Sequence, residues 1–209
     1  MKNLIIIGAR GFGRELYLAA KESLGYGEKF VVKGYLDSQS DALDKYLDYP
    51  RILSSPEEYE LDEEDVFIIA LGDPKWRKHY AELMGRKGAS FISLIHRTAS
   101  LGSTVKLGQG CYIARNALLT ADIQVGNHTC IFHGAMVGHD CVIGDYCHLA
   151  AQVFLGGGVH VDQGAVLHPG SRVAPHKRIG ESAVVGIGSA VISNVKPSTT
   201  GFGMPAIEF

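Results

Sequence analysis

Residues 131–149 read IFHGAMVGHDCVIGDYCHL, and the spacing of their aliphatic residues decides the fold. Every sixth position of this stretch is aliphatic: Ile131, Val137, Ile143 and Leu149. The same period runs in both directions from Leu101 to Val191, where each sixth residue is Leu, Ile or Val. A period this regular over half of a chain indicates a repeat architecture rather than an ordinary globular core.

The hexads predict a parallel β-helix. The residue two positions before each aliphatic one is mostly small or slim, as at Ala135 and Cys141, so both point to the same side of a short strand. Gly often follows the aliphatic residue, as at Gly138 and Gly144, and we expect it to supply unusual backbone angles at a corner. Three hexads close a coil of 18 residues, so the repeat region predicts about five coils. No insertion interrupts the period, so any site must lie on the wall of the helix.

Composition restricts the class of protein. The chain has 209 residues, 46% hydrophobic and 20% charged, with a net charge of −2, which favours a globular protein and disfavours a nucleic-acid-binding one. No apolar run reaches the roughly 18–20 residues of a membrane span, and the start lacks the features of a signal peptide. The four Cys show neither metal-type nor disulfide-type spacing, so we expect reduced thiols in a cytoplasmic protein, and three of them (Cys111, Cys141 and Cys147) fall on small interior positions of the hexads.

The first half predicts a small α/β unit resembling half of a Rossmann fold. We expect strands at residues 2–7, 30–36, 66–71 and 90–95, with helices after the first and third strands. The domain boundary is predicted near residue 95, which gives a nucleotide- or nucleotide-sugar-binding domain at 1–95 and the β-helix with its tail at 96–209. About 95 residues suit a mononucleotide or nucleotide sugar better than NAD.

Three strand ends carry candidate binding residues. The first strand leads into a Gly-rich turn that contains Arg10, Gly11 and Phe12, where free amides at a helix start can face a phosphate. The second strand ends at Asp37-Ser38, and an acid there commonly meets a ribose hydroxyl. Asp73 follows the third strand. Parallel strand ends lie at one edge of a sheet, so these residues predict an acceptor pocket.

Together, the short α/β unit, the hexads and the tail Gly203-Met204-Pro205-Ala206 resemble one family along nearly the whole chain. It is the hexapeptide-repeat sugar acyltransferases of the sialic acid O-acetyltransferase type, which include the N-acetyltransferases of UDP-linked 4-amino sugars in bacillosamine synthesis. The strongest local match is VGHDCVIGDYCH at residues 137–148. The resemblance implies a left-handed β-helix and acetyl-CoA as co-substrate, without a metal. It also implies N-acetylation of the 4-amino group of a nucleotide-linked amino-dideoxy sugar.

The resemblance also assigns roles to residues. It makes His139 the general base, supported by Asp140, and gives His148 a contact with acetyl-CoA. Gly157 follows His139 by one coil of 18 residues, so it should stack on His139, and we expect its N–H to meet the thioester oxygen. A neighbouring corner column contains Pro169 and Ile187, along which the pantetheine arm can run.

We also expect a homotrimer. The uninterrupted helix has no arm to cover the donor, so a neighbouring copy must supply the second wall of the CoA cleft.

Several alternatives remain open at this stage. An O-acetyltransferase acting on sialic acid or a polysaccharide would use the same base. More remote alternatives are a γ-type carbonic anhydrase, for which His128 and His133 have suitable spacing but a third ligand is missing, and a non-catalytic scaffold. Family members commonly carry a His in the first Gly loop, where this chain has Phe12, so the sugar and nucleotide are not defined by the resemblance. The acyl group is likewise inferred from the family.

Overall fold

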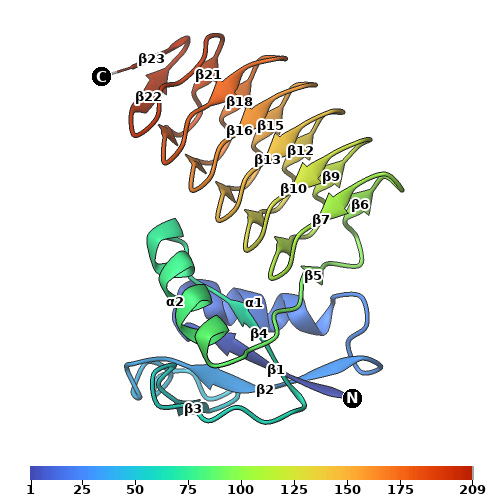
Figure 1. Ribbon diagram of the computed structural model, residues 1–209, viewed down its shortest axis with the longest axis vertical. Helices are drawn as coiled ribbons and strands as arrows, with labels where there is room; N and C mark the ends of the chain where they lie inside the picture. Colours follow the sequence, from blue (N-terminus) through green and yellow to red (C-terminus); the bar gives the residue numbers. More distant parts are fainter. Residues whose placement is uncertain (209) are drawn as a thin grey trace. The chain divides into compact units, whose positions relative to one another are not determined.

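The computed structural model describes residues 1–208, with side chains described through Pro205. The chain divides into two compact units, Met1–Arg97 and a second unit that begins at Thr98. Each unit has its own architecture (Figure 1).

The first unit is built on a four-stranded parallel sheet with the strand order β3-β2-β1-β4. Its elements are β1 (Lys2–Ile7), α1 (Gly11–Lys21), β2 (Phe30–Leu36), β3 (Ile52–Ser54), β4 (Asp65–Ile69), α2 (Pro74–Arg86) and β5 (Leu94–Ile95). The central strand β1 is a continuous apolar run, as expected of a parallel strand covered on both faces. Its residues Leu4 to Ile7 are at most 1% exposed.

One strand of this sheet differs from the sequence prediction. The fourth strand of the sheet is β3, a three-residue edge strand that pairs with β2. The predicted strand at 90–95 contributes only an isolated bridge between Phe67 and Phe91 and the two-residue strand β5. A three-residue strand between Pro50 and Pro56 has too short a pattern to show alternation in sequence.

The second unit is a parallel β-solenoid made of two-residue strands. The strands are β6 (Ser100–Leu101), β7 (Lys106–Leu107), β8 (Tyr112–Ile113), β9 (Leu118–Leu119), β10 (Gln124–Val125), β11 (Cys130–Ile131), β12 (Met136–Val137), β13 (Val142–Ile143), β14 (His148–Leu149), β15 (Phe154–Leu155), β16 (His160–Val161), β17 (Val166–Leu167), β18 (Arg172–Val173), β19 (Arg178–Ile179), β20 (Val184–Val185), β21 (Ala190–Val191), β22 (Thr200–Gly203) and β23 (Ala206–Glu208). Each strand from β6 to β18 pairs with the strand 18 residues later, as Cys130 with His148 shows. Three hexads therefore form one coil.

The strands stack into three faces. Face A contains β7, β10, β13, β16 and β19; face B contains β8, β11, β14, β17, β20 and β22, with β23 added antiparallel; face C contains β6, β9, β12, β15, β18 and β21. The prediction of about five coils is therefore wrong, because two faces each carry six parallel strands. The sequence count stopped at Val191, whereas β22 continues face B in a segment that no longer follows the hexad period.

The glycines that follow the aliphatic residues have a different role from the one expected. None of them has a positive φ; the positive-φ residues stand two positions later in the hexad, such as Asp140 (φ 59°) and Tyr146 (φ 59°). A Cβ built on Gly144 would lie 2.7 Å from the backbone nitrogen of Gln163 in the next coil. Glycine is therefore needed there for the close approach of stacked coils, and the prediction of corner angles is wrong for these positions.

The interior of the solenoid is apolar. The aliphatic residues of the hexads, from Ile113 to Val191, are at most 5% exposed, and all four cysteines are buried and free. The hexads predicted interior positions for Cys111, Cys141 and Cys147, but not for Cys130. Three of these thiols donate to carbonyls fifteen residues later, as Cys141 does to Gly156 at 3.2 Å. Small side chains fit these positions because the coil interior is narrow, and each thiol still finds an acceptor.

The close approach of the coils predicts the result of two opposite substitutions. Gly144→Ala should destabilise the protein by roughly 2–3 kcal/mol, because the added methyl meets backbone atoms that cannot move without separating two coils. Ser182→Gly, at an exposed corner with φ 55°, should be neutral or stabilising by up to about 1 kcal/mol. Chemical denaturation of both variants checks this. An unchanged stability of Gly144→Ala would contradict the stacking account.

Candidate functional site

His139 and Asp140 form an exposed pair at the corner between face C and face A, which we call the His139 corner. Nδ1 of His139 lies 2.7 Å from Oδ2 of Asp140, and both side chains are 66% exposed. The positive φ of Asp140 lets consecutive side chains at this corner turn toward each other, and Asp is among the residues that tolerate it. If the carboxylate accepts the Nδ1 proton, the opposite ring nitrogen Nε2 carries a lone pair that can accept a proton.

Gly157 of the next coil lies directly against the His139 ring. A Cβ built on Gly157 would be 2.7 Å from both Cε1 and Nε2 of His139. The backbone carbonyl oxygens of this corner accept hydrogen bonds from the next coil. Gly158 N–H donates to His139 O at 2.8 Å, and His176 N–H donates to Gly157 O at 3.0 Å. Within the described part of the chain, the Gly157 N–H donates to no group. The corner therefore places a proton acceptor beside a backbone donor that is free to bind a ligand.

Cys141 follows this pair in the sequence but is not available for covalent chemistry. Its side chain is fully buried, and burial raises the pKa of its thiol above the ordinary value. A neutral buried thiol is a poor nucleophile. The corner is therefore suited to proton transfer during a direct attack by a bound substrate.

The other predicted residues of the β-helix lie elsewhere on the prism. His148 begins β14 on face B, where its ring is 4.7 Å from that of Phe132. Pro169 and Ile187 are exposed at the corner between faces B and C, which we call the His133 corner after the residue of the same column. Gly188 N–H donates to Pro169 O at 2.9 Å. Successive coils are therefore joined at this corner by the same kind of backbone hydrogen bond as at the His139 corner. One chain therefore carries the two groups of residues on opposite sides of face C, and does not bring them together.

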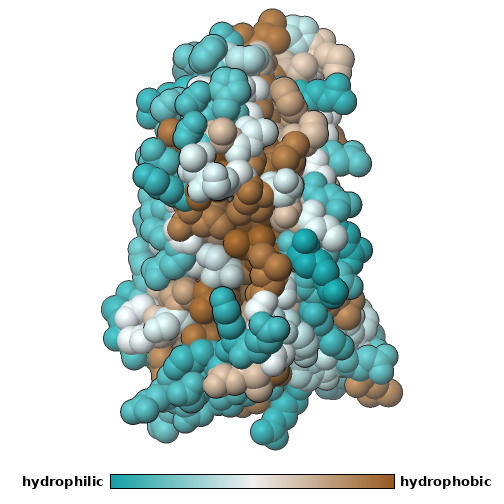
Figure 2. Space-filling view, turned by 90° about the vertical axis from the view of Figure 1, so that its right-hand side faces the viewer, coloured by the Kyte–Doolittle hydropathy of each residue, from teal (hydrophilic) through white to brown (hydrophobic). Residues whose placement is uncertain are grey.

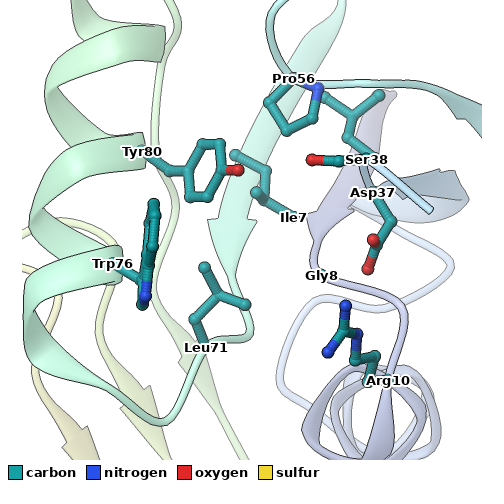
Figure 3. A pocket seen from close by; sticks show the side chains of 10 residues that line it. Ile7, Gly8, Arg10, Asp37, Ser38, Pro56, Leu71, Trp76 and Tyr80 are labelled. Atoms are coloured by element: carbon teal, nitrogen blue, oxygen red, sulfur yellow. The ribbon is translucent and has the colours of Figure 1, made fainter.

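The first unit holds a pocket of about 240 Å³ at the carboxyl ends of β1, β2 and β4 (Figure 3). Of the predicted residues, Arg10, Asp37 and Ser38 line it. Asp37 is held in place by two backbone donors, since Oδ2 accepts from Ala9 N–H at 2.8 Å and Oδ1 from Gln39 N–H at 2.9 Å. Each carboxylate oxygen keeps a second lone pair for a ligand.

Three predicted residues do not line this pocket. Gly11 and Phe12 belong to the first turn of α1, whose N-cap residue Arg10 makes no side-chain capping hydrogen bond. Asp73 is the N-cap of α2, where its carboxylate accepts from Lys75 N–H at 2.8 Å. The pattern Asp73-Pro74 is a helix-start signal, and it explains this acid without a ligand.

The sequence reasoning missed the aromatic wall of the pocket. Trp76 and Tyr80 lie one helical turn apart on α2 and line the pocket, with Leu71 and Pro56 beside them. Figure 3 shows both rings on the side of the pocket opposite Asp37 and Arg10. In the sequence, the available signal was the i, i+4 spacing of Trp76 and Tyr80 after a strand end. The same spacing is typical of a helix face that packs against a core, so it does not by itself indicate a pocket.

Over residues 1–205, whose side chains the structure describes, no group of three or more His, Cys, Asp or Glu is arranged to hold a metal ion. Neither helix in that range has the length and hydrophobicity needed to cross a membrane. His128 is 3% exposed and stacks on Tyr146 with an interplanar angle of 5°, whereas His133 is exposed at a different corner. The two histidines considered for zinc therefore do not converge in one chain.

Two family models match the two units. The model of the PglD N-terminal domain matches residues 3–84, and that of the GMPPB C-terminal domain matches residues 90–187. Among curated proteins, the acyl-[acyl-carrier-protein]–UDP-N-acetylglucosamine O-acyltransferase of Pseudomonas paraeruginosa is 41% identical over 86 residues, or 41% of this chain. That match covers 33% of the relative, so the chain spans about a third of the length of the curated relatives it matches.

Solved structures match over the whole chain. A histidine-to-asparagine mutant of perosamine N-acetyltransferase from Caulobacter crescentus, in complex with CoA and GDP-perosamine, is 26% identical with a TM-score of 0.88, covering 100% of this chain and 97% of that one. The acetyltransferase domain of PglB from Neisseria gonorrhoeae has a TM-score of 0.89 at 22% identity and full coverage of both chains, which shows a common fold. The first unit therefore matches the PglD N-terminal domain, and the whole chain, with its uninterrupted hexad solenoid, is similar to sugar N-acetyltransferases of known structure.

Proposed function

We propose that the protein transfers an acetyl group from acetyl-CoA to the 4-amino group of a nucleotide-linked amino-dideoxy sugar. The observation that carries the proposal is the His139–Asp140 pair lying against Gly157 on the wall of the β-helix. The full-length likeness to perosamine N-acetyltransferase, whose structure holds CoA and GDP-perosamine, supports the substrate class. In this proposal, residues 1–95 recognise the nucleotide part of the acceptor, residues 96–209 carry the chemistry, and the coil is left-handed.

The geometry suggests a direct transfer. Nε2 of His139 accepts a proton from the sugar amine as the amine nitrogen attacks the thioester carbon, and Asp140 stabilises the imidazolium that forms. The carbonyl oxygen gains negative charge, and the Gly157 N–H donates a hydrogen bond to it. Collapse of this intermediate breaks the carbon–sulfur bond, and the CoA thiolate takes the proton from His139. The products are the N-acetyl sugar and free CoA.

Replacing the proposed base tests this mechanism. His139→Ala should lower kcat by roughly 10²–10⁴, the usual contribution of a general base, and Asp140→Asn should lower it less. Stability should hardly change, because both side chains are mostly exposed. Steady-state kinetics with acetyl-CoA and a panel of UDP-, GDP- and dTDP-linked 4-amino sugars measures this. His160→Ala, an exposed histidine on face A, is the control. Near-normal turnover of His139→Ala would contradict the proposal.

A substitution at Gly157 tests the stacked arrangement without touching an ionisable group. Gly157→Ala places a methyl 2.7 Å from the imidazole, so the ring must shift and the approach to the backbone N–H is narrowed. We expect a loss of roughly 10–100-fold in kcat, the size of a misplacement of about 1 Å at a reacting centre. The corner variant Ser182→Gly should keep full activity. A normal kcat of Gly157→Ala would show that neither the position of the His139 ring nor access to the Gly157 N–H contributes to catalysis, and would contradict the proposed arrangement.

The donor site is proposed to form between copies of the chain in a homotrimer. Face C lies between the His139 corner and the His133 corner, and it exposes Leu118 (37%), Met136 (44%) and Phe154 (39%) in one column. Figure 2 shows an apolar strip along the solenoid. If face C turns toward a threefold axis, each His139 corner meets the His133 corner of the next copy, and both half-sites join at every interface. His148, Pro169 and Ile187 then bind acetyl-CoA opposite His139.

The trimer makes a prediction for the apolar column. Met136→Glu should dissociate the assembly, because it places a charge in a buried contact, and activity should fall with assembly. Gln124→Glu, the same charge on face A, is the control and should leave both unchanged. Sedimentation velocity and acetyl transfer, measured on the same samples, check this. A fully active monomer of about 22 kDa would contradict it.

O-acyl transfer is the second candidate. It is favoured by the 41% identity over 86 residues to a UDP-N-acetylglucosamine O-acyltransferase, and the same base could activate a hydroxyl. Including sialic acid, a polysaccharide and UDP-N-acetylglucosamine in the substrate panel distinguishes the two. Faster transfer to a hydroxyl than to any 4-amino sugar would favour this candidate.

A further inference from the structure

Three consecutive glycines at residues 156–158, which we call the glycine row, leave one coil of the His139 corner without side chains. No other place in the 209 residues has three glycines in succession. At the corresponding positions, the coil before carries His139 and Asp140, and the coil after carries Pro175 and His176. The side chains that reach the glycine row therefore come from these two neighbouring coils.

Three rings lie against the glycine row. A Cβ built on the middle glycine would be 2.7 Å from Nε2 of His139, and one built on the last glycine would be 2.5 Å from Nδ1 of His176. A Cβ built on the first glycine would be 2.8 Å from both Cγ and Cδ of Pro175. Consecutive Cα atoms are only about 3.8 Å apart, so the imidazole of His176 and the ring of Pro175 flank the point where His139 meets the backbone.

The backbone fixes the position of His176, while its side chain has no structural partner. Its φ is 59°, and its N–H donates to Gly157 O at 3.0 Å. The side chain is exposed, and within the described part of the chain its imidazole makes no hydrogen bond. A neutral imidazole has one N–H donor and one acceptor nitrogen, so His176 offers both to a ligand at the His139 corner.

The proposed acceptor carries two groups of opposite polarity beside its amine. In a 4-amino-4,6-dideoxy sugar, the ring carbon on one side of the amine-bearing carbon carries a hydroxyl, and the ring carbon on the other side carries the C6 methyl group. When the amine lies at Nε2 of His139, both groups lie next to it. A covered hydroxyl needs a hydrogen-bond partner, whereas a methyl group gains from apolar contact. His176 and Pro175 supply one of each.

We propose that His176 forms a hydrogen bond with the sugar hydroxyl beside the 4-amino group, and that Pro175 packs against the C6 methyl group. The two contacts orient the sugar ring so that its amine faces His139. They select a 6-deoxy acceptor with a free hydroxyl at C3. The inference rests on the proposed function, because it takes the acceptor to be a 4-amino sugar. His176 takes no part in the proton transfer and acts as a specificity-determining residue.

A matched pair of acceptors tests the hydroxyl contact. For the wild-type protein, kcat/KM should be roughly 3- to 10-fold higher for a nucleotide-linked 4-amino-4,6-dideoxy sugar than for its 3-deoxy analogue, the usual worth of one hydrogen bond. His176→Gly, which suits the φ of 59°, should bring this ratio to about one, and His176→Gln should retain part of it. His160→Ala, on face A, is the control and should keep the full ratio. An unchanged ratio in His176→Gly would overturn the proposal, even if the KM for acetyl-CoA were raised.

A second pair of acceptors tests the methyl contact. The wild-type protein should prefer the 6-deoxy sugar over its 6-hydroxy counterpart by roughly 10-fold in kcat/KM, because the extra hydroxyl meets an apolar ring. Pro175→Ser supplies a hydrogen-bond partner there and should reduce this preference. Pro197→Ser is the matched control, since Pro197 is exposed and packs on Gly180 at another corner. An unchanged preference in Pro175→Ser would remove Pro175 from the proposal.

Binding measurements separate this inference from the proposed function. Calorimetry of each acceptor with the full-length protein, without acetyl-CoA, gives the same ratios as affinities, whether or not transfer occurs. Loss of the hydroxyl ratio in His176→Gly without acetyl transfer to any amino sugar would support the His176 contact and remove the acetyltransferase proposal. Transfer that depends on His139, with an unchanged ratio in His176→Gly, would do the reverse. Neither binding nor transfer of any 4-amino sugar would remove both.

Discussion

One backbone hydrogen bond, repeated at each corner from His128 to Gly188, determines which side chains of the β-helix can meet. A residue with positive φ donates its N–H to the carbonyl nineteen residues earlier, as Asp140 does to Ala121 at 3.0 Å and Gly158 to His139 at 2.8 Å. The bond fixes successive coils in an 18-residue register, with the strands paired in the same register. Because the register cannot slip by one residue without turning the hexad core outward, His139 must lie against Gly157. The arrangement of side chains at this corner is thus a consequence of the coil length.

The same regularity explains why, in the proposed mechanism, a single chain does not complete the site. A rigid prism without inserted loops cannot fold one wall over another, so residues on the His139 corner and residues on the His133 corner stay apart. Face C, which separates them, is the face with an exposed apolar column. Association through that face would remove apolar surface from water and join the two half-sites in one step. Assembly and activity are therefore expected to depend on the same residues.

Much of the β-helix could be predicted from the sequence, because its coils follow from the six-residue period of aliphatic residues. The hexads predicted the three-sided coil, three of the four buried cysteines and the 18-residue spacing between His139 and Gly157. What they did not predict depends on packing between elements: the close approach that requires Gly144, and the continuation of face B by β22 beyond the repeat. In the first unit, Asp37 was predicted from its place at a strand end, whereas Trp76 and Tyr80 were missed. Whether an aromatic pair on a helix faces a core or a cavity depends on the tertiary structure, and Asp73, read as a ligand, is a helix cap.

The central claim is that each reaction centre combines His139 of one copy with His148 of another, and a mixing experiment tests it most directly. His139→Ala and His148→Ala chains are purified separately, unfolded, refolded together in equal amounts and assayed at low acetyl-CoA concentration, where both parent proteins are nearly inactive. Random assembly of a ring in which each site uses both copies should restore about one quarter of the wild-type activity, because one interface in four then pairs two unmodified residues. If both residues of a site come from the same chain, every site contains a substitution, and the mixture will be no more active than its parents.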